Sequence, residues 1–106
     1  MSVTDVDTVD GIAVTNDGKT LKLLITDHLK FKDDEAHHLL TLQEKLNSYL
    51  GFIESEQYRK VYPESDIDNV IIEIHFKYKI SDNCKKFIDV VNNQIGALNT
   101  VCVIVQ

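Results

Sequence analysis

The stretch from Asn69 to Ile80 alternates apolar and polar side chains along its length. Successive side chains of a β-strand point to opposite faces, so this period of two predicts a strand with one buried and one solvated face. Only Ile71 breaks the alternation. A shift of one residue would exchange the two faces, so we expect the register of this strand to be tightly specified.

The other elements follow from turn residues and helical spacing. Asn16-Asp17-Gly18 accepts the positive φ angles of a hairpin turn and separates two short apolar stretches. Apolar residues recurring every three or four positions indicate two helices. We expect strands over 9–15, 19–26, 69–80 and 100–105, and helices from 33 or 34 to about 55 and from 82 to about 96.

This order, β-β-α-β-α-β, predicts the fold class. Crossovers between parallel strands are right-handed in nearly all cases, so two successive crossovers that progress the same way across the sheet place both helices on one face. The alternation in 69–80, with one buried and one solvated face, requires this arrangement. The sequence therefore predicts an α+β fold: a two-layer α/β sandwich with a four-stranded mixed sheet, in one domain over 1–106. The strand order 1-2-3-4 and the order 2-1-3-4 both fit.

The long helix should bury one apolar stripe. We expect that stripe to contain Ala36, Leu39, Leu40, Leu42, Leu46, Tyr49, Leu50 and Ile53. In the second helix we expect Asn92 to face water, while Cys84 joins the apolar side.

Composition excludes several classes of partner. The chain of 106 residues has a formal net charge of −6, which argues against nucleic-acid binding and against anionic membrane surfaces. No apolar stretch approaches the ~20 residues of a membrane span, and the acidic N-terminus is unlike a secretory signal. Two cysteines without CxxC spacing indicate reduced thiols, so we expect a cytoplasmic protein.

One cluster of residues suggests a metal. Asp27, His28, Asp33, His37 and His38 bring carboxylates and imidazoles close in sequence, and both groups bind metal ions. Neighbouring helical residues diverge by about 100°, however, so adjacent histidines do not readily hold the same ion. The simpler interpretation is an acidic helix start with solvated histidines, and no cofactor is predicted.

Cys84 lies near the expected start of a helix, beside Lys85 and Lys86. Such an environment lowers the pKa of a thiol. A nucleophilic cysteine also needs a positioned base, and no histidine lies close to Cys84 in sequence. We therefore interpret Cys84 as a small hydrophobic residue of the apolar stripe.

The uncovered face of the sheet is the main candidate for a contact surface. The last strand is apolar on both sides, yet the helices cover only one side, and an edge strand with bare backbone invites pairing. A solvated face, or coverage by the N-terminal arm, is the alternative. The candidate contact residues are Leu24, Glu73, His75, Lys77, Lys79 and Val103.

The amino-acid sequence of several segments resembles that of a family of small uncharacterised bacterial proteins of about this length. The resemblance lies in residues 9–12, 24–29, 42–50, 52–55 and 62–63. It implies a bacterial cytoplasmic protein made of this one domain. The family has no assigned activity, so no catalytic residue follows from it.

Two hypotheses about function remain. The first is a non-catalytic protein-interaction module, acting as a homodimer or against a protein partner through the open sheet face or the edge strand. A basic toxin is one such partner, with this acidic chain as its inhibitor or immunity protein, because complementary charge speeds encounter. The second is a metal-dependent enzyme or metal-binding protein that uses the aspartate and histidine cluster.

Overall fold

The computed structural model describes residues 3–4, 9–32, 34–56, 58–61, 67–96 and 99–105. All four expected strands and both expected long helices are present in it. A short helix over Tyr58–Val61 was not expected. The elements are β1 (Gly11–Val14), β2 (Thr20–Asp27), α1 (Glu35–Glu54), α2 (Tyr58–Val61), β3 (Asn69–Phe76), α3 (Asp82–Ile95) and β4 (Thr100–Val105).

The four strands form one mixed sheet in the order β1-β2-β3-β4. β1 and β2 are antiparallel, whereas β2, β3 and β4 run parallel. In the middle of the sheet, Leu23 pairs with Ile72 and Ile72 pairs with Cys102. The observed order is the first of the two that the sequence allowed, and the predicted α+β fold is confirmed.

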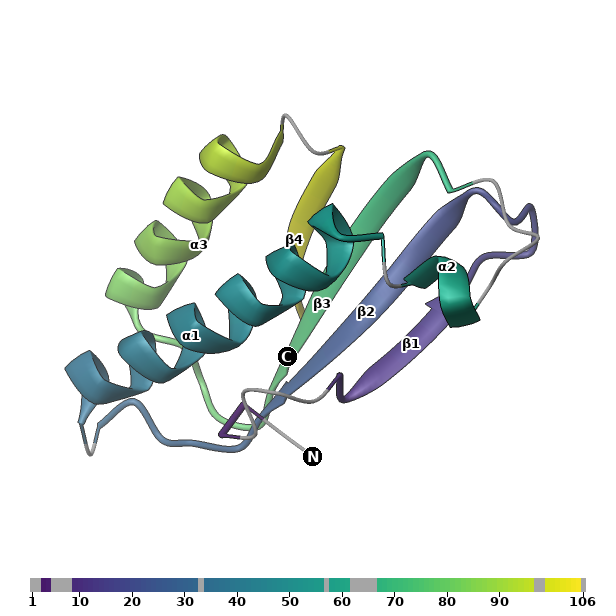
Figure 1. The fold of residues 1–106 in the computed structure, drawn as a ribbon. Helices are drawn as coiled ribbons and strands as arrows, with labels where there is room; N and C mark the ends of the chain where they lie inside the picture. The colour runs from purple at the N-terminus through teal and green to yellow at the C-terminus, as the bar shows by residue number, and fades with distance from the viewer. Residues whose placement is uncertain are drawn as a thin grey trace.

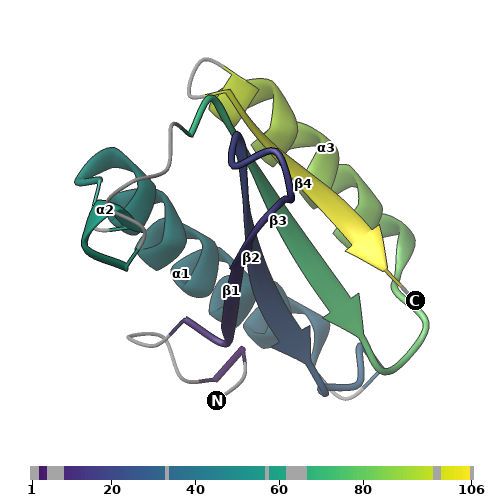
Figure 2. The ribbon, with the colours of Figure 1, turned by 90° about the vertical axis from the view of Figure 1, so that its right-hand side faces the viewer.

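Both long helices lie on the same side of the sheet (Figures 1 and 2). Burial follows this arrangement, because side chains alternate between buried and more exposed along β2 and β3. The fully buried residues of the sheet, which form the centre of the core, are Leu21, Leu23, Ile25, Ile72 and Ile74.

β3 is shorter than predicted. It ends at Phe76 instead of Ile80. The backbone N–H of Lys77 donates to the carbonyl of Asp27, the last residue of β2, and the chain then bends toward α3. Ile80 is still buried beyond the bend, so the alternation of side chains outlasts the strand pairing.

The buried stripe of α1 is rotated from the predicted one. Ala36 is exposed, and Leu40 is 51% exposed. His38 and Lys45 are buried in their place. The histidine was expected to be solvated, and the lysine was not part of the predicted stripe. Both polar side chains reach a carboxylate inside the protein, as described below, and this contact makes their burial tolerable.

Side-chain caps fix where the two long helices begin. The Asp34 carboxylate accepts a hydrogen bond from the His37 N–H at the start of α1. The Ser81 hydroxyl accepts one from the Cys84 N–H at the start of α3. Each cap satisfies one of the backbone donors that a helix start leaves unpaired, as the predicted helix starts require.

Candidate contact surface

The side of the sheet away from the helices presents one row of side chains from each strand. We call this surface the open face, and Figure 2 shows the sheet in front of the helices. Strand register and the alternation of burial define its members. They are Gly11, Ala13, Thr20, Lys22, Leu24, Thr26, Asn69, Ile71, Glu73, His75, Val101, Val103 and Val105.

β4 supplies an exposed apolar strip to the open face. Val101 is 43% exposed and Val103 is 39% exposed, whereas Cys102 between them is 4% exposed on the helix side. β4 is therefore apolar on both sides, as the sequence indicated. Exposed apolar side chains that adjoin one another are typical of a surface that contacts something else.

Charged side chains sit in the middle of the open face. The Lys22 Nζ atom lies 3.9 Å from Glu73 Oε2, and the His75 Nε2 atom lies 3.3 Å from Glu73 Oε1. With histidine neutral, the formal charges of the open face cancel, although the whole chain carries −6. The excess negative charge therefore lies elsewhere on the chain.

A shallow hollow of about 350 Å³ indents the open face from β1 across β2 to β3. Gly11 forms part of it, and a Cβ atom at Gly11 would lie only 3.1 Å from Leu24 Cδ2. The absence of a side chain at Gly11 therefore keeps this part of the surface low. The residues that line the hollow are Gly11, Ile12, Ala13, Lys22, Leu23, Leu24, Glu73 and His75.

The predicted contact residues do not all lie in the sheet. Leu24, Glu73, His75 and Val103 belong to the open face. The exposed residues Lys77 and Lys79 lie past the end of β3. They were expected on the open face because the strand was predicted to continue to Ile80, whereas β3 ends at Phe76. Contact between any of these residues and a partner stays a prediction.

The backbone hydrogen-bonding groups on the outer edge of β4 are partly occupied within the chain. The Asn92 side chain of α3 accepts a hydrogen bond from the Cys102 N–H at 2.7 Å and donates one to the Cys102 carbonyl at 3.1 Å. Asn92 was expected to face water. It occupies both backbone positions through which Cys102 would bind an added strand, which makes the face a better contact surface than this edge.

Two described residues of the N-terminal segment, Val3 and Asp10, pack into the interior between the sheet and the helices. Val3 is fully buried, and its N–H donates to the Thr26 carbonyl at 2.8 Å. The Asp10 carboxylate accepts a hydrogen bond from the Thr26 N–H at 3.0 Å and turns toward α1. Val3 and Asp10 are thus used in the core, and the Asp10 carboxylate touches the open face only at its border, where it lies 3.4 Å from the Thr26 hydroxyl.

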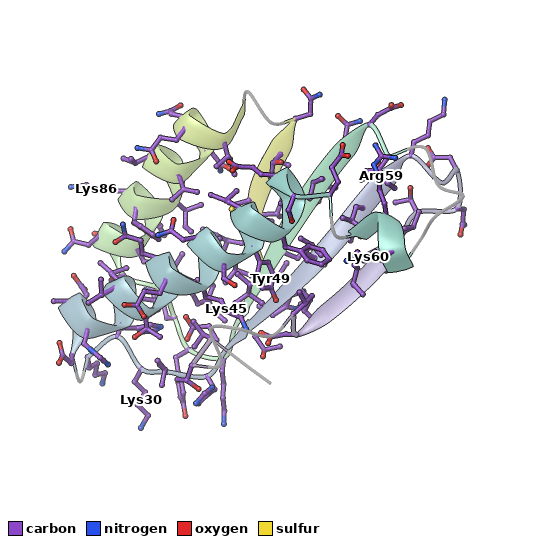
Figure 3. The ribbon with its side chains drawn as sticks, viewed as in Figure 1. Lys30, Lys45, Tyr49, Arg59, Lys60 and Lys86 are labelled. Atoms are coloured by element: carbon purple, nitrogen blue, oxygen red, sulfur yellow. The ribbon has the colours of Figure 1, made fainter. Side chains whose placement is uncertain are left out.

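A buried ion pair holds Asp10 against α1. The Lys45 Nζ atom lies 3.0 Å from Asp10 Oδ1, and the exposed fractions of the two side chains are 0% and 1%. The Tyr49 hydroxyl accepts a hydrogen bond from the Asp10 N–H at 2.8 Å and donates one to the Leu24 carbonyl at 2.5 Å. Figure 3 shows Lys45 and Tyr49 reaching from α1 toward the sheet.

Replacement of Tyr49 by phenylalanine tests this network. Burial raises the pKa of the Tyr49 phenol to about 12, so the hydroxyl stays protonated at neutral pH and donates its hydrogen bond. Tyr49→Phe leaves the Asp10 N–H and the Leu24 carbonyl without this partner. We therefore expect the free energy of unfolding to fall by about 1–2 kcal/mol. Urea denaturation measures this change, and an unchanged midpoint would contradict it.

The aspartate and histidine cluster is divided by the fold. His38 Nε2 lies 2.8 Å and 2.6 Å from the two carboxylate oxygens of Asp27, and this pair is buried. His28 and His37 are exposed, and Asp33 lies outside the described residues. Across the part of the chain that the structure describes, no three side chains gather that could hold a metal ion. The metal hypothesis gains no support there.

The two thiols are buried. Burial, with the nearby negative charges of Asp27 and Glu35, raises the pKa of Cys84 to about 12. Burial alone raises the pKa of Cys102 to about 12. Cys84 therefore differs from an activated cysteine, whose pKa is lowered, and fits its interpretation as part of the apolar stripe.

Over residues 1–104, the chain matches the family described as "Family of unknown function (DUF6572)", and it belongs to that family. This confirms the resemblance to a family of uncharacterised proteins. Comparisons with curated proteins and with solved structures give no match. Within the described residues, the helices are too short or too polar for any of them to traverse a lipid bilayer.

Proposed function

We propose that this member of the family is a non-catalytic interaction module, and that its open face binds a second copy of the same chain. The observation that carries the proposal is the exposed strip of Val101 and Val103 beside a charge-balanced centre. A solvated sheet face ordinarily carries polar side chains at such positions, because one side of an antiparallel or mixed sheet can face water.

Charge favours a second copy as the partner. Two chains that each carry −6 repel one another over most surfaces. Lys22 and Glu73 offset one another on the open face, so two open faces meet without this repulsion. A basic partner protein would instead be drawn to the acidic remainder of the chain.

Substitution of Val103 by lysine tests the proposal. A lysine at this position places a charge in the proposed contact, which disfavours association. We expect the wild-type chain to show a concentration-dependent dimer in sedimentation equilibrium, and Val103→Lys to weaken that dimer at least tenfold.

Val90→Lys is the matched control. Val90 is 53% exposed and lies on α3, away from the open face. Val90→Lys should dimerise as the wild type does, and both variants should melt within a few degrees of it. A wild-type chain that is monomeric at every concentration, or equal weakening by both substitutions, would contradict the proposal.

A further inference from the structure

The outer edge of β1 carries backbone groups that no described residue binds. β1 lies at one end of the strand order, so only one of its sides is paired. The Thr15 N–H donates to the Thr20 carbonyl of β2, in the register of the β1–β2 pairing. Backbone groups of successive residues point to opposite sides of a strand, so those of Ile12 and Val14 point away from β2. Within the described part of the chain these groups have no partner.

This open edge is short, because the chain closes it at both ends. Beyond Gly11, the Thr26 N–H donates to the Asp10 carboxylate at 3.0 Å, and the Thr26 carbonyl accepts from the Val3 N–H at 2.8 Å. Those two groups of β2 would otherwise pair with a longer β1. At the other end, the chain enters the hairpin turn after Thr15. The open edge therefore has room for one short added strand.

The hollow of the open face is accessible from this edge. Gly11 and Ala13 line it on the β1 side, and neither has a side chain larger than a methyl group. Glu73 and His75 of β3 form its far side, and Leu24 of β2 lies between. A side chain that comes from a strand beside β1 can therefore pass over the two small residues and lie on Leu24.

The strands of this chain are poorly suited to the open edge of β1. Two β1 strands paired with each other bring only glycine, alanine and threonine to the open face, and none of these fills a hollow of about 350 Å³. β4 of another copy would bring its valines, but the Cys102 N–H and carbonyl are bound to the Asn92 side chain. The edge therefore fits a strand from a different protein better than a strand from a second copy.

We infer that the open edge of β1 binds an extended segment of another protein, with a bulky apolar side chain opposite Ala13. The segment exchanges hydrogen bonds with Ile12 and Val14, as in other cases of strand addition. Its residue opposite Ala13 forms a non-hydrogen-bonded pair, in which side chains approach most closely. That side chain points to the open face and enters the hollow. An uncharged group suits the hollow because Lys22 and Glu73 already offset one another there.

Titration with a synthetic peptide tests the inference on the full chain. The probe is the capped peptide Lys-Thr-Val-Phe-Val-Thr-Lys, whose central phenylalanine is the bulky side chain and whose lysines keep it soluble. We expect saturable NMR shifts of the Ile12 and Val14 N–H signals, and slower hydrogen exchange of both. Val103→Lys, which is designed to prevent the proposed dimer, should bind the peptide as the wild type does. The result therefore does not depend on the proposed function.

Two matched peptides separate the backbone contact from the side-chain contact. Replacing the phenylalanine by alanine removes only the group that enters the hollow, and should weaken binding about fivefold or more. N-methylation of both valines removes the N–H groups that face β1 but keeps the side chains and the charge. It should abolish the shifts at Ile12 and Val14. Equal binding of all three peptides would show attraction by the lysine charges alone and would overturn the inference.

Two proline variants identify the edge that is used. Val14→Pro removes an outward N–H from β1, and proline is tolerated on an edge strand at such a position. Ile104→Pro removes the N–H that points outward from β4, two residues after that of Cys102. Binding should weaken about tenfold in Val14→Pro and stay unchanged in Ile104→Pro, because only β1 exchanges hydrogen bonds with the peptide.

Two results would overturn the inference. One is the reverse pattern in the proline variants, which would place the peptide on β4. The other is an absence of shifts at Ile12 and Val14 with the peptide in excess. If Val14→Pro does not fold, the N-methylated peptide still decides the question, because it tests the same hydrogen bonds on the wild-type chain.

Discussion

Lys45→Met is expected to lower the free energy of unfolding by about 3–5 kcal/mol, the usual cost of removing one partner from a buried ion pair. Lys45 and Asp10 are both buried, and their charged atoms are 3.0 Å apart. Methionine fills much of the space of the lysine stem but leaves the Asp10 carboxylate without its cation. Urea denaturation followed by circular dichroism measures the loss.

Two further variants make this result specific. Lys86 lies exposed on α3, and its side chain points away from the sheet (Figure 3), so Lys86→Met should change stability by less than about 0.5 kcal/mol. Adding Asp10→Leu to Lys45→Met removes the stranded charge and should recover part of the loss. Equal stability of Lys45→Met and the wild type would show that the ion pair does not hold the N-terminal segment in place.

The Asp27→Ala substitution is expected to lower the free energy of unfolding by about 3 kcal/mol, because the buried His38 ring and the partly buried Leu29 N–H lose their acceptor. The Asp27 carboxylate contacts His38 Nε2 and also accepts a hydrogen bond from the Leu29 N–H at 3.0 Å. The Phe31 ring stacks on the His38 ring with centroids 3.9 Å apart, which keeps water from replacing the carboxylate. Thermal and urea unfolding both report this loss.

His37→Ala is the matched control for this pair. His37 is the exposed neighbour of His38 in α1, so its removal should change stability by less than about 0.5 kcal/mol. If Asp27→Ala and His37→Ala unfold at the same urea concentration, the Asp27–His38 contact contributes nothing measurable to the fold.

Local periodicity predicted most of the fold because each strand and helix has its own repeat. The alternation beginning at Asn69 predicted a strand with one dry face, and Asn16-Asp17-Gly18 predicted the turn between β1 and β2. The end of β3 was missed because alternation continues to Ile80 after pairing with β2 stops. A side-chain pattern does not record where backbone pairing ends.

The polar interior was not predicted because its partners are far apart in sequence. Lys45 is buried against Asp10, and Asn92 is bound to Cys102 across the space between α3 and β4. Hydropathy assigns each of these polar residues to solvent when its partner is unknown. The signal available in the sequence was spacing: His38 and Lys45 fit the same helical stripe as Leu42 and Tyr49.

Part of the candidate contact surface followed from alternation and part did not. Glu73, His75 and Val103 were expected on the uncovered face, and the structure places them there. The hollow was not foreseen, because it depends on how closely Gly11 approaches Leu24 across two strands. Such an approach is a property of tertiary packing and leaves no repeat in the sequence.

The amide of Asn92 also limits how far copies of this chain can assemble. Head-to-tail growth of a continuous sheet would require β4 of each copy to accept β1 of the next, and the Cys102 backbone groups are already satisfied within the chain. Joining by open faces, as in the proposed dimer, consumes the same surface on both copies and leaves none for a third. If copies join in this way, the Asn92 amide favours a closed pair over a fibre.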